Sequence, residues 1–198
     1  MANDENVDRR TVRTCNAIET TFQQMVCEMD EKAINVKAIS ERAGINRKTF
    51  YLHYSCIEDL FQNTCDKICE DYSETLAIAD PESMIATSEE EAILRFYRAF
   101  YEYFTSQDLY VERLICSPSY YTWGNQIIDA CAAVNRKRRN IYKSMTDEER
   151  SLFNNLAAVS LFNTYRQWVA LGKNISIDSL VEFSHKFIYH GMSCVLGN

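Results

Sequence analysis

Glycine and proline are scarce in this chain, which has five glycines and two prolines among its 198 residues. The long stretches between them repeat apolar residues every three or four positions, the period of an amphipathic helix. The scarcity excludes a fold that depends on frequent tight turns, and the periodicity predicts an all-α protein. At this length a small module followed by a larger helical domain is expected.

Signals for secretion, membrane insertion and metal binding are absent as well. The eight cysteines show no CxxC pair and no Cys/His zinc spacing, and the N-terminus, MANDENVDRR, is polar and acidic. We therefore expect a cytoplasmic protein with free thiols and no cofactor. No apolar run approaches the roughly 20 residues that span a bilayer. Cys65 and Cys69 are interpreted either as two small buried hydrophobes or as thiols that share a metal or oxidise.

Catalytic motifs are also lacking. The sequence contains no nucleophile elbow, no glycine-rich phosphate loop and no HExxH motif, and His53, His185 and His190 have no obvious catalytic partners. The sequence therefore does not predict an enzyme.

Charge is divided unevenly along the chain. The net charge is −7, yet residues 36–54 carry four cations (Lys37, Arg42, Arg47 and Lys48) against one anion (Glu41), a local charge of +3. The rest of the chain then carries −10. An acidic body with a basic tip is attracted to a polyanion only through that tip, which orients the encounter.

The basic segment has the pattern of two short helices joined by a turn. Asn35 is predicted to cap the first helix, whose apolar face is formed by Val36, Ile39 and Ala43. Gly44 is expected to end that helix, because glycine adopts a positive φ without a Cβ clash. The two helices should therefore cross at a steep angle.

The second helix, predicted over Arg47 to Tyr54, divides its side chains between two roles. Phe50 and Tyr54 repeat at helical spacing and should face inward, which leaves the polar side chains on other faces. This division suits a helix that places polar side chains in the DNA major groove. Arg47 is suited to the two acceptors of a guanine, and Thr49, Tyr51 and His53 to phosphates or a thymine methyl.

The segment SERAGINRKTFYLHY resembles the operator-binding motif of the TetR/AcrR family of bacterial regulators, and the resemblance extends over about residues 9–61. It implies a homodimer that binds a palindromic operator in double-stranded DNA, most often as a repressor released by a small-molecule inducer. The DNA-binding residues expected on this basis are Asn35, Lys37, Asn46, Arg47, Lys48, Thr49, Tyr51 and His53.

One position departs from the family pattern. Members usually place a lysine near the start of the next helix, where it binds a phosphate, and this chain has Ile57 there. The departure leaves a second interpretation open, in which the chain is an adaptor that kept the helix-turn-helix fold and acts through protein–protein contacts.

The remaining periodicity predicts a DNA-binding domain over residues 1–56 and a larger regulatory and dimerisation domain over residues 57–198. The first helix should place Val12, Cys15 and Ile18 beneath the motif, and Asp147 should cap a late helix. Helices are expected at about 9–29, 57–79, 90–105, 110–116, 119–145, 147–171 and from 176 onward.

Aromatic residues are concentrated in the second domain, and two interpretations of them remain open. They either line an apolar cavity whose hydroxyl and indole groups orient a small molecule, or they fill the core. The candidate ligand-binding residues are Phe96, Phe100, Tyr103, Tyr120, Trp123, Arg138, Tyr165 and Trp168.

The last helix carries two apolar lines, which implies that two of its sides are buried. One side is expected to pack on the body and the other on a second copy of the chain, in a twofold dimer built from the last two helices. Two DNA-binding domains related in this way would bind half-sites about 34–36 Å apart, or a multiple of that, on the operator. The predicted interface line consists of Leu180, Ser184, Phe187 and Gly191.

Overall fold

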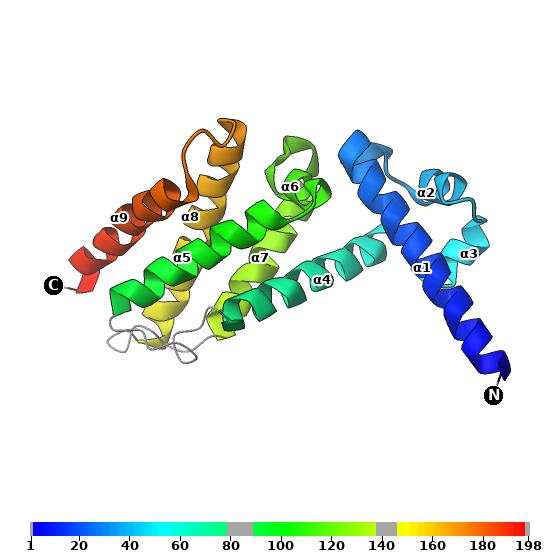
Figure 1. Ribbon diagram of the computed structural model, residues 1–198, viewed down its shortest axis with the longest axis horizontal. Helices are drawn as coiled ribbons and strands as arrows, with labels where there is room; N and C mark the ends of the chain where they lie inside the picture. The colour runs from blue at the N-terminus through cyan, green and yellow to red at the C-terminus, as the bar shows by residue number, and fades with distance from the viewer. Residues whose placement is uncertain (1, 79–88, 138–145, 197–198) are drawn as a thin grey trace.

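The computed structural model describes residues 2–78, 89–137 and 146–196, and all regular structure within these ranges is helical, as predicted. A head of α1, α2 and α3 lies at one end, and a body of α5 to α9 at the other, with α4 between them (Figure 1). The bounds are α1 Ala2–Glu28, η1 Glu31–Ala33, α2 Val36–Arg42, α3 Arg47–Tyr51, α4 Ile57–Ile78, α5 Glu89–Ser106, α6 Leu109–Cys116, η2 Pro118–Tyr120, α7 Tyr121–Lys137, α8 Asp147–Ala170 and α9 Ile177–Leu196.

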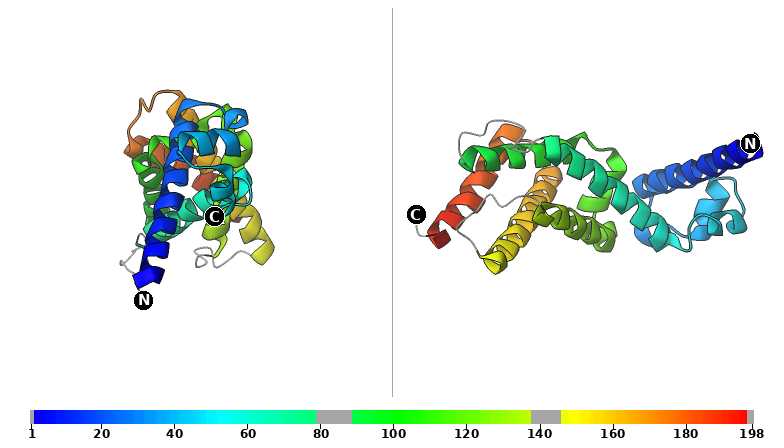
Figure 2. Two further views of the ribbon diagram at one scale, coloured as in Figure 1. Left: turned by 90° about the vertical axis from the view of Figure 1, so that its right-hand side faces the viewer. Right: turned by 90° about the horizontal axis from the view of Figure 1, so that it is seen from below.

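The two ends of the chain lie at opposite ends of the molecule (Figures 1 and 2). The head therefore projects away from α8 and α9 (Figure 2). Within the described ranges, none of the helices combines the length and the hydropathy that a membrane span requires.

The head packs around one apolar side of α1. Ile18, Phe22 and Met25 are buried there with Ile39 of α2 and Phe50 of α3. Val12, which was expected on the same face, is 50% exposed. The N-terminal end of α1 projects past α2 and α3 (Figure 1). The helix is also longer than predicted, beginning at Ala2.

The ends of α8 follow local capping rules, but the residue that caps its start differs from the predicted one. Asp147 was expected to cap α8, but the cap is Thr146, whose Oγ1 accepts from the Glu149 backbone N–H at 3.2 Å. The Glu149 carboxylate accepts in return from the Thr146 N–H at 2.9 Å, which completes a capping box. At the other end Gly172 ends the helix with φ +77°.

Aromatic rings fill the body core. Phe100, Phe104 and Phe162 meet with ring centroids 4.9–5.0 Å apart, and Tyr72 of α4 packs edge-on or tilted against the first two. These distances are within the range preferred by offset and edge-to-face pairs. The second half of α4 is thus part of the body core.

A smaller aromatic cluster joins the head to the body. Trp123 of α7 stacks on Phe61 of α4 with centroids 4.9 Å apart and planes 11° apart, and its centroid is 5.6 Å from that of Phe22 in α1. Close by, the Tyr120 hydroxyl donates to the Met29 carbonyl at 2.5 Å, and the Ser119 hydroxyl donates to Asp30 at 2.7 Å. Side chains from α7 and η2 therefore hold the C-terminal end of α1.

Gly124 allows α7 to approach the C-terminal turn of α6. A Cβ at this position would lie 2.4 Å from the Leu114 carbonyl oxygen and 3.2 Å from the Arg166 guanidinium. Arg166 of α8 occupies the same junction and donates from Nε to the Ile115 carbonyl at 2.6 Å. At the junction of α6, α7 and α8 there is therefore room for the hydrogen atom of a glycine but not for a methyl group.

We predict that Gly124→Ala lowers the free energy of unfolding by about 1–3 kcal/mol, because a backbone carbonyl cannot move aside as a flexible side chain would. Thermal or urea denaturation followed by circular dichroism measures the change. Thr122→Ala, at an exposed position of the same helix, is the matched control and should have little effect. Equal stability of the two variants would contradict the close approach.

Candidate nucleic-acid interface

Two asparagines cap the starts of α2 and α3, on either side of α2 and the turn that follows it. Asn35 Oδ1 accepts from the Ala38 backbone N–H at 3.0 Å, and Asn46 Oδ1 accepts from the Thr49 N–H at 2.8 Å and from the Thr49 hydroxyl at 3.2 Å. Between them Gly44 has φ +67°, as its place after α2 predicted. Each asparagine therefore uses its side-chain oxygen to start a helix.

The side chains of α3 and of the segment just after it separate into a buried and an exposed set. Phe50 and Tyr54 are buried as predicted, whereas Arg47, Lys48 and Tyr51 are exposed. The Tyr51 ring stands edge-on to Phe50, with centroids 5.7 Å apart and planes 89° apart, and is 56% exposed. Exposed Lys37 in α2 and half-buried Thr49 complete this surface. The helix itself is shorter than expected, ending at Tyr51.

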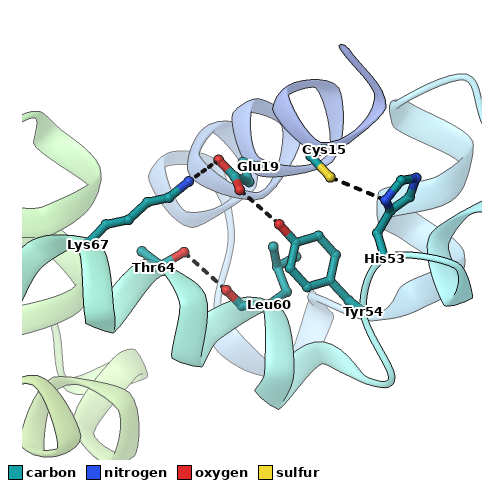
Figure 3. A network of polar contacts seen from close by, with 7 residues as sticks. All are labelled: Cys15, Glu19, His53, Tyr54, Leu60, Thr64 and Lys67. Carbon is teal, nitrogen blue, oxygen red and sulfur yellow. Dashed lines mark hydrogen bonds and ion pairs between the residues drawn. The ribbon is translucent and has the colours of Figure 1, made fainter. Parts of the chain in front are cut away.

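His53 lies in a different environment from the other predicted DNA-binding side chains. Its ring is half-buried against α1, with Nδ1 3.2 Å from Cys15 Sγ (Figure 3). Burial, and then the charge of Glu19, raise the pKa of the Cys15 thiol, so the sulfur keeps its proton at neutral pH and can donate to Nδ1. His53 therefore contributes to the packing of α1 against the end of α3.

Glu19 of α1 fixes the position of α3 through a second set of contacts (Figure 3). The Tyr54 hydroxyl donates to Glu19 Oε1 at 2.8 Å, and Lys67 Nζ of α4 donates to Glu19 Oε2 at 2.6 Å. Burial, and then the bond to this carboxylate, raise the pKa of Tyr54, so the hydroxyl remains a donor. One carboxylate thus joins α1, the segment after α3, and α4.

Ile57, which stands where the family pattern has a lysine, is only 9% exposed and belongs to the head core. It is the first residue of α4, and the preceding turn is held by Asp59, whose carboxylate accepts from the Ser55 backbone N–H at 2.8 Å. An isoleucine packed in this way cannot bind a phosphate. Lys67, farther along α4, is already paired with Glu19.

The aromatic residues proposed to line a ligand cavity are packed as core, and their polar atoms have backbone partners. Tyr103 donates to the Ile68 carbonyl at 2.8 Å, Tyr165 to that of Phe104 at 2.8 Å, and the Trp168 indole to that of Ile175 at 2.9 Å. Tyr120 and Trp123 belong to the junction between head and body. The remaining candidates are Phe100, which is buried, Phe96, which is partly buried, and Arg138, which lies outside the described residues.

The predicted interface line on α9 mixes two sides of the helix. Leu180 and Ser184 are 2% and 1% exposed within a single protomer, and the Ser184 and Tyr101 hydroxyls share a 2.6 Å hydrogen bond. These two residues face the body because α9 packs on α5 through that side. Phe187, in contrast, is 70% exposed, and an added Cβ at Gly191 would meet nothing within 4 Å.

Two groups of exposed residues extend beyond those predicted from the sequence. One is a set of exposed apolar residues on α8 and α9, which we call the α8–α9 strip: Leu152, Leu156, Val159, Phe183 and Phe187. Of its members only Phe187 was predicted, and the spacing of three, four or seven residues within each helix would have indicated the others. The other is a group of arginines on α1, spaced RRxxR, at positions 9, 10 and 13.

No protein-family model matches the chain. By sequence, the chain is 32% identical over 92 residues to a Bacillus subtilis (strain 168) protein described as the uncharacterized HTH-type transcriptional regulator YxbF. The match covers 46% of this chain, and the chain spans about a quarter of the length of that relative (24%).

Solved structures share the fold over nearly the whole chain. A TetR transcriptional regulator from Streptococcus agalactiae 2603V superimposes with a TM-score of 0.65 at 18% identity, covering 93% of this chain and 98% of that one. The fatty acid degradation regulator FadR from Bacillus halodurans gives 0.60 at 14% identity, covering 88% and 94%. The flavonoid-responsive regulator FrrA gives 0.60 at 18% identity, covering 90% and 96%.

The chain therefore has the fold of TetR-type transcriptional regulators, and the resemblance seen in the helix-turn-helix residues is confirmed at the level of the fold. The all-α prediction is confirmed with it.

We predict that Asn46→Ala lowers the free energy of unfolding by about 1 kcal/mol, because the Thr49 N–H loses its acceptor at the start of α3. Chemical denaturation of the free protein measures this loss. Asn46→Ser supplies another capping oxygen and should recover most of the stability. A loss of the same size in both variants would show that the cap is not the reason.

Proposed function

We propose that the protein is a transcriptional regulator of TetR type that binds double-stranded DNA through α2 and α3, with residues 1–56 as the DNA-binding domain. The observation that carries this proposal is the separation of side chains in and just after α3, where Phe50 and Tyr54 are buried while Arg47, Lys48 and Tyr51 are exposed. The fold supports it, since the solved structures with this fold include TetR regulators. We infer that it acts in the cytoplasm, where its DNA target lies.

In this proposal the exposed set acts in two ways. Arg47, at the first position of α3, pairs with the N7 and O6 acceptors of a guanine in the major groove. Lys37, Lys48 and Tyr51 contact phosphates and orient the helix without reading sequence. Asn35 and Asn46 act indirectly, because their oxygens hold the two helix starts in place.

A homodimer on a palindromic operator completes the proposed binding unit. The support for it is the α8–α9 strip, which leaves Phe183 and Phe187 exposed with their rings parallel and 6.4 Å apart. A twofold dimer brings the same patch of both copies together and buries it. The strip lies at the opposite end of the molecule from the head, so pairing leaves both heads free (Figures 1 and 2).

We further propose that DNA binding represses transcription and is released by a small molecule. Two neighbours of this fold are described as a fatty acid degradation regulator and a flavonoid-responsive regulator, which supports an apolar or aromatic inducer. Because Tyr103, Tyr165 and Trp168 already donate to carbonyls, a ligand among them has to displace packed side chains. An inducer that shifts helices in this way weakens operator binding about tenfold for each 1.4 kcal/mol of coupling.

One observation favours a second function. The burial of Ile57 removes a phosphate contact that the family pattern includes. An adaptor that binds another protein through the exposed side of α3 needs no such contact. The two functions differ in whether the full chain prefers any DNA sequence over bulk competitor.

We predict that Arg47→Ala lowers affinity for a duplex selected from a random pool by about 1–3 kcal/mol, or roughly 5- to 150-fold, and reduces the preference for that duplex. The reason is the loss of a bidentate contact to one base pair. Fluorescence anisotropy at stated salt measures both quantities. Combining it with Tyr51→Ala should abolish operator binding.

Lys37→Ala is the matched comparison for Arg47→Ala. It should weaken binding to all duplexes alike and lower the slope of log affinity against log salt by about 0.9, because it removes only a phosphate contact. Loss of partner-protein binding in the Arg47 variant, with no DNA preference in the wild type, would favour the adaptor instead.

We predict that Phe187→Asp converts a dimer into a monomer at micromolar concentration, because pairing would bury an unpaired carboxylate. Light scattering of the purified protein measures the mass. Tyr121→Asp, at an exposed position on α7, introduces the same charge away from the α8–α9 strip and should leave the dimer intact. A wild-type monomer under these conditions would contradict the proposed assembly.

A further inference from the structure

The exposed side of the head carries a second cationic feature besides α3. Arg9, Arg10 and Arg13 line a surface groove of about 560 Å³ together with Thr14, Ala17 and Ile45. The five α1 residues are spaced so that they share one side of the helix. Ile45 comes from the turn between α2 and α3, directly before the Asn46 cap and Arg47. The groove therefore runs from α1 to the base of α3.

The three arginines are available to a ligand. They are exposed, and none of the side chains that the structure describes forms an ion pair with them. Among the same side chains, no acidic one lines the groove. Asp4, Glu5 and Asp8 precede the arginines in the sequence, so the segment as a whole is not basic and any attraction has to be local to the groove.

The chemistry of the groove fits a polyanion with regularly spaced oxygens. An arginine guanidinium donates a fork of N–H groups that matches a phosphate in a bidentate manner. Ile45, which lines the groove, is two residues before Arg47, so a duplex held by α3 would pass close to the groove. The N-terminal end of α1 also projects past α3, on the side of the molecule away from the body (Figures 1 and 2).

We propose that Arg9, Arg10 and Arg13 form a second DNA contact, in which α1 binds phosphates of the duplex beside the groove that α3 enters. This inference rests on the proposed DNA-binding function. It also explains how the head anchors the sugar–phosphate backbone although Ile57 cannot. Contacts of this kind position the protein and carry no sequence information.

The test compares the full-length wild type with a variant that combines Arg9→Ala, Arg10→Ala and Arg13→Ala. Alanine preserves helix formation at exposed positions, so α1 should remain folded, and circular dichroism checks this. Affinity for a duplex selected from a random pool is measured over a range of salt concentrations. The slope of log affinity against log salt should fall by about 0.9 for each phosphate that the variant no longer binds, or between about 0.9 and 2.7 in all.

A control variant removes the same charge from the body by combining Arg98→Ala, Arg150→Ala and Lys173→Ala. All three lie outside the head in surface ion pairs, which contribute little to stability. The slope of the control should match that of the wild type. The order of preference among related duplexes should be unchanged in both variants.

Other outcomes overturn the inference in distinguishable ways. If the two triple variants have the same slope while the wild type still selects a duplex, the arginines act only through net charge and α1 does not touch the DNA. A changed order of sequence preference in the α1 variant would show base reading and not phosphate binding. A wild type that selects no duplex at all would overturn the proposed function and this inference together.

Discussion

The stacking of Trp123 on Phe61 and its packing near Phe22 hold the head against the body, and the arrangement of the rest depends on it. Trp123 belongs to α7, Phe61 to α4 and Phe22 to α1, so one indole contacts helices from both parts. Because α4 also contributes Tyr72 to the body core, it cannot shift in the body without changing the packing around the indole. A ligand that moved α4 would therefore move the head, and this junction is where the proposed coupling between inducer and DNA would pass.

Local signals in the sequence predicted the head well. The Asn35 cap, the positive φ of Gly44 and the inward positions of Phe50 and Tyr54 depend on residues within one or two turns of each other. His53 could not be placed in this way, because its neighbour Cys15 is 38 positions away in the chain. The same limit applies to Val12, since periodicity shows which side of a helix is apolar but not where its packing partners end.

In the body, the sequence showed where aromatic residues are concentrated, but not whether they line a ligand cavity or fill the core. Tyr103 and Tyr165 fit a cavity wall and a packed core equally well, and only the acceptors of their hydroxyls distinguish the two. On α9 the apolar spacing was predicted correctly, but the residues were assigned wrongly to the side that faces the body and the side that is exposed. Leu180 and Ser184 face α5, and the exposed side is marked by Phe183 and Phe187. The orientation of an amphipathic helix with two apolar lines depends on the neighbouring helix, which periodicity does not identify.

The distribution of charge within the head bears on the proposed DNA binding. With a net charge of −7 the chain as a whole is repelled by DNA, so the proposed binding would depend on a small number of cations that reach the duplex. Burial of Ile57 stabilises the start of α4 in the head core and removes one such position. Arg9, Arg10 and Arg13 lie beside the base of α3, where added positive charge offsets that loss without occupying a core position. If the proposed phosphate contacts of α1 exist, the head core and the DNA backbone are served by different helices, because Ile57 of α4 packs in the core while the arginines of α1 remain exposed.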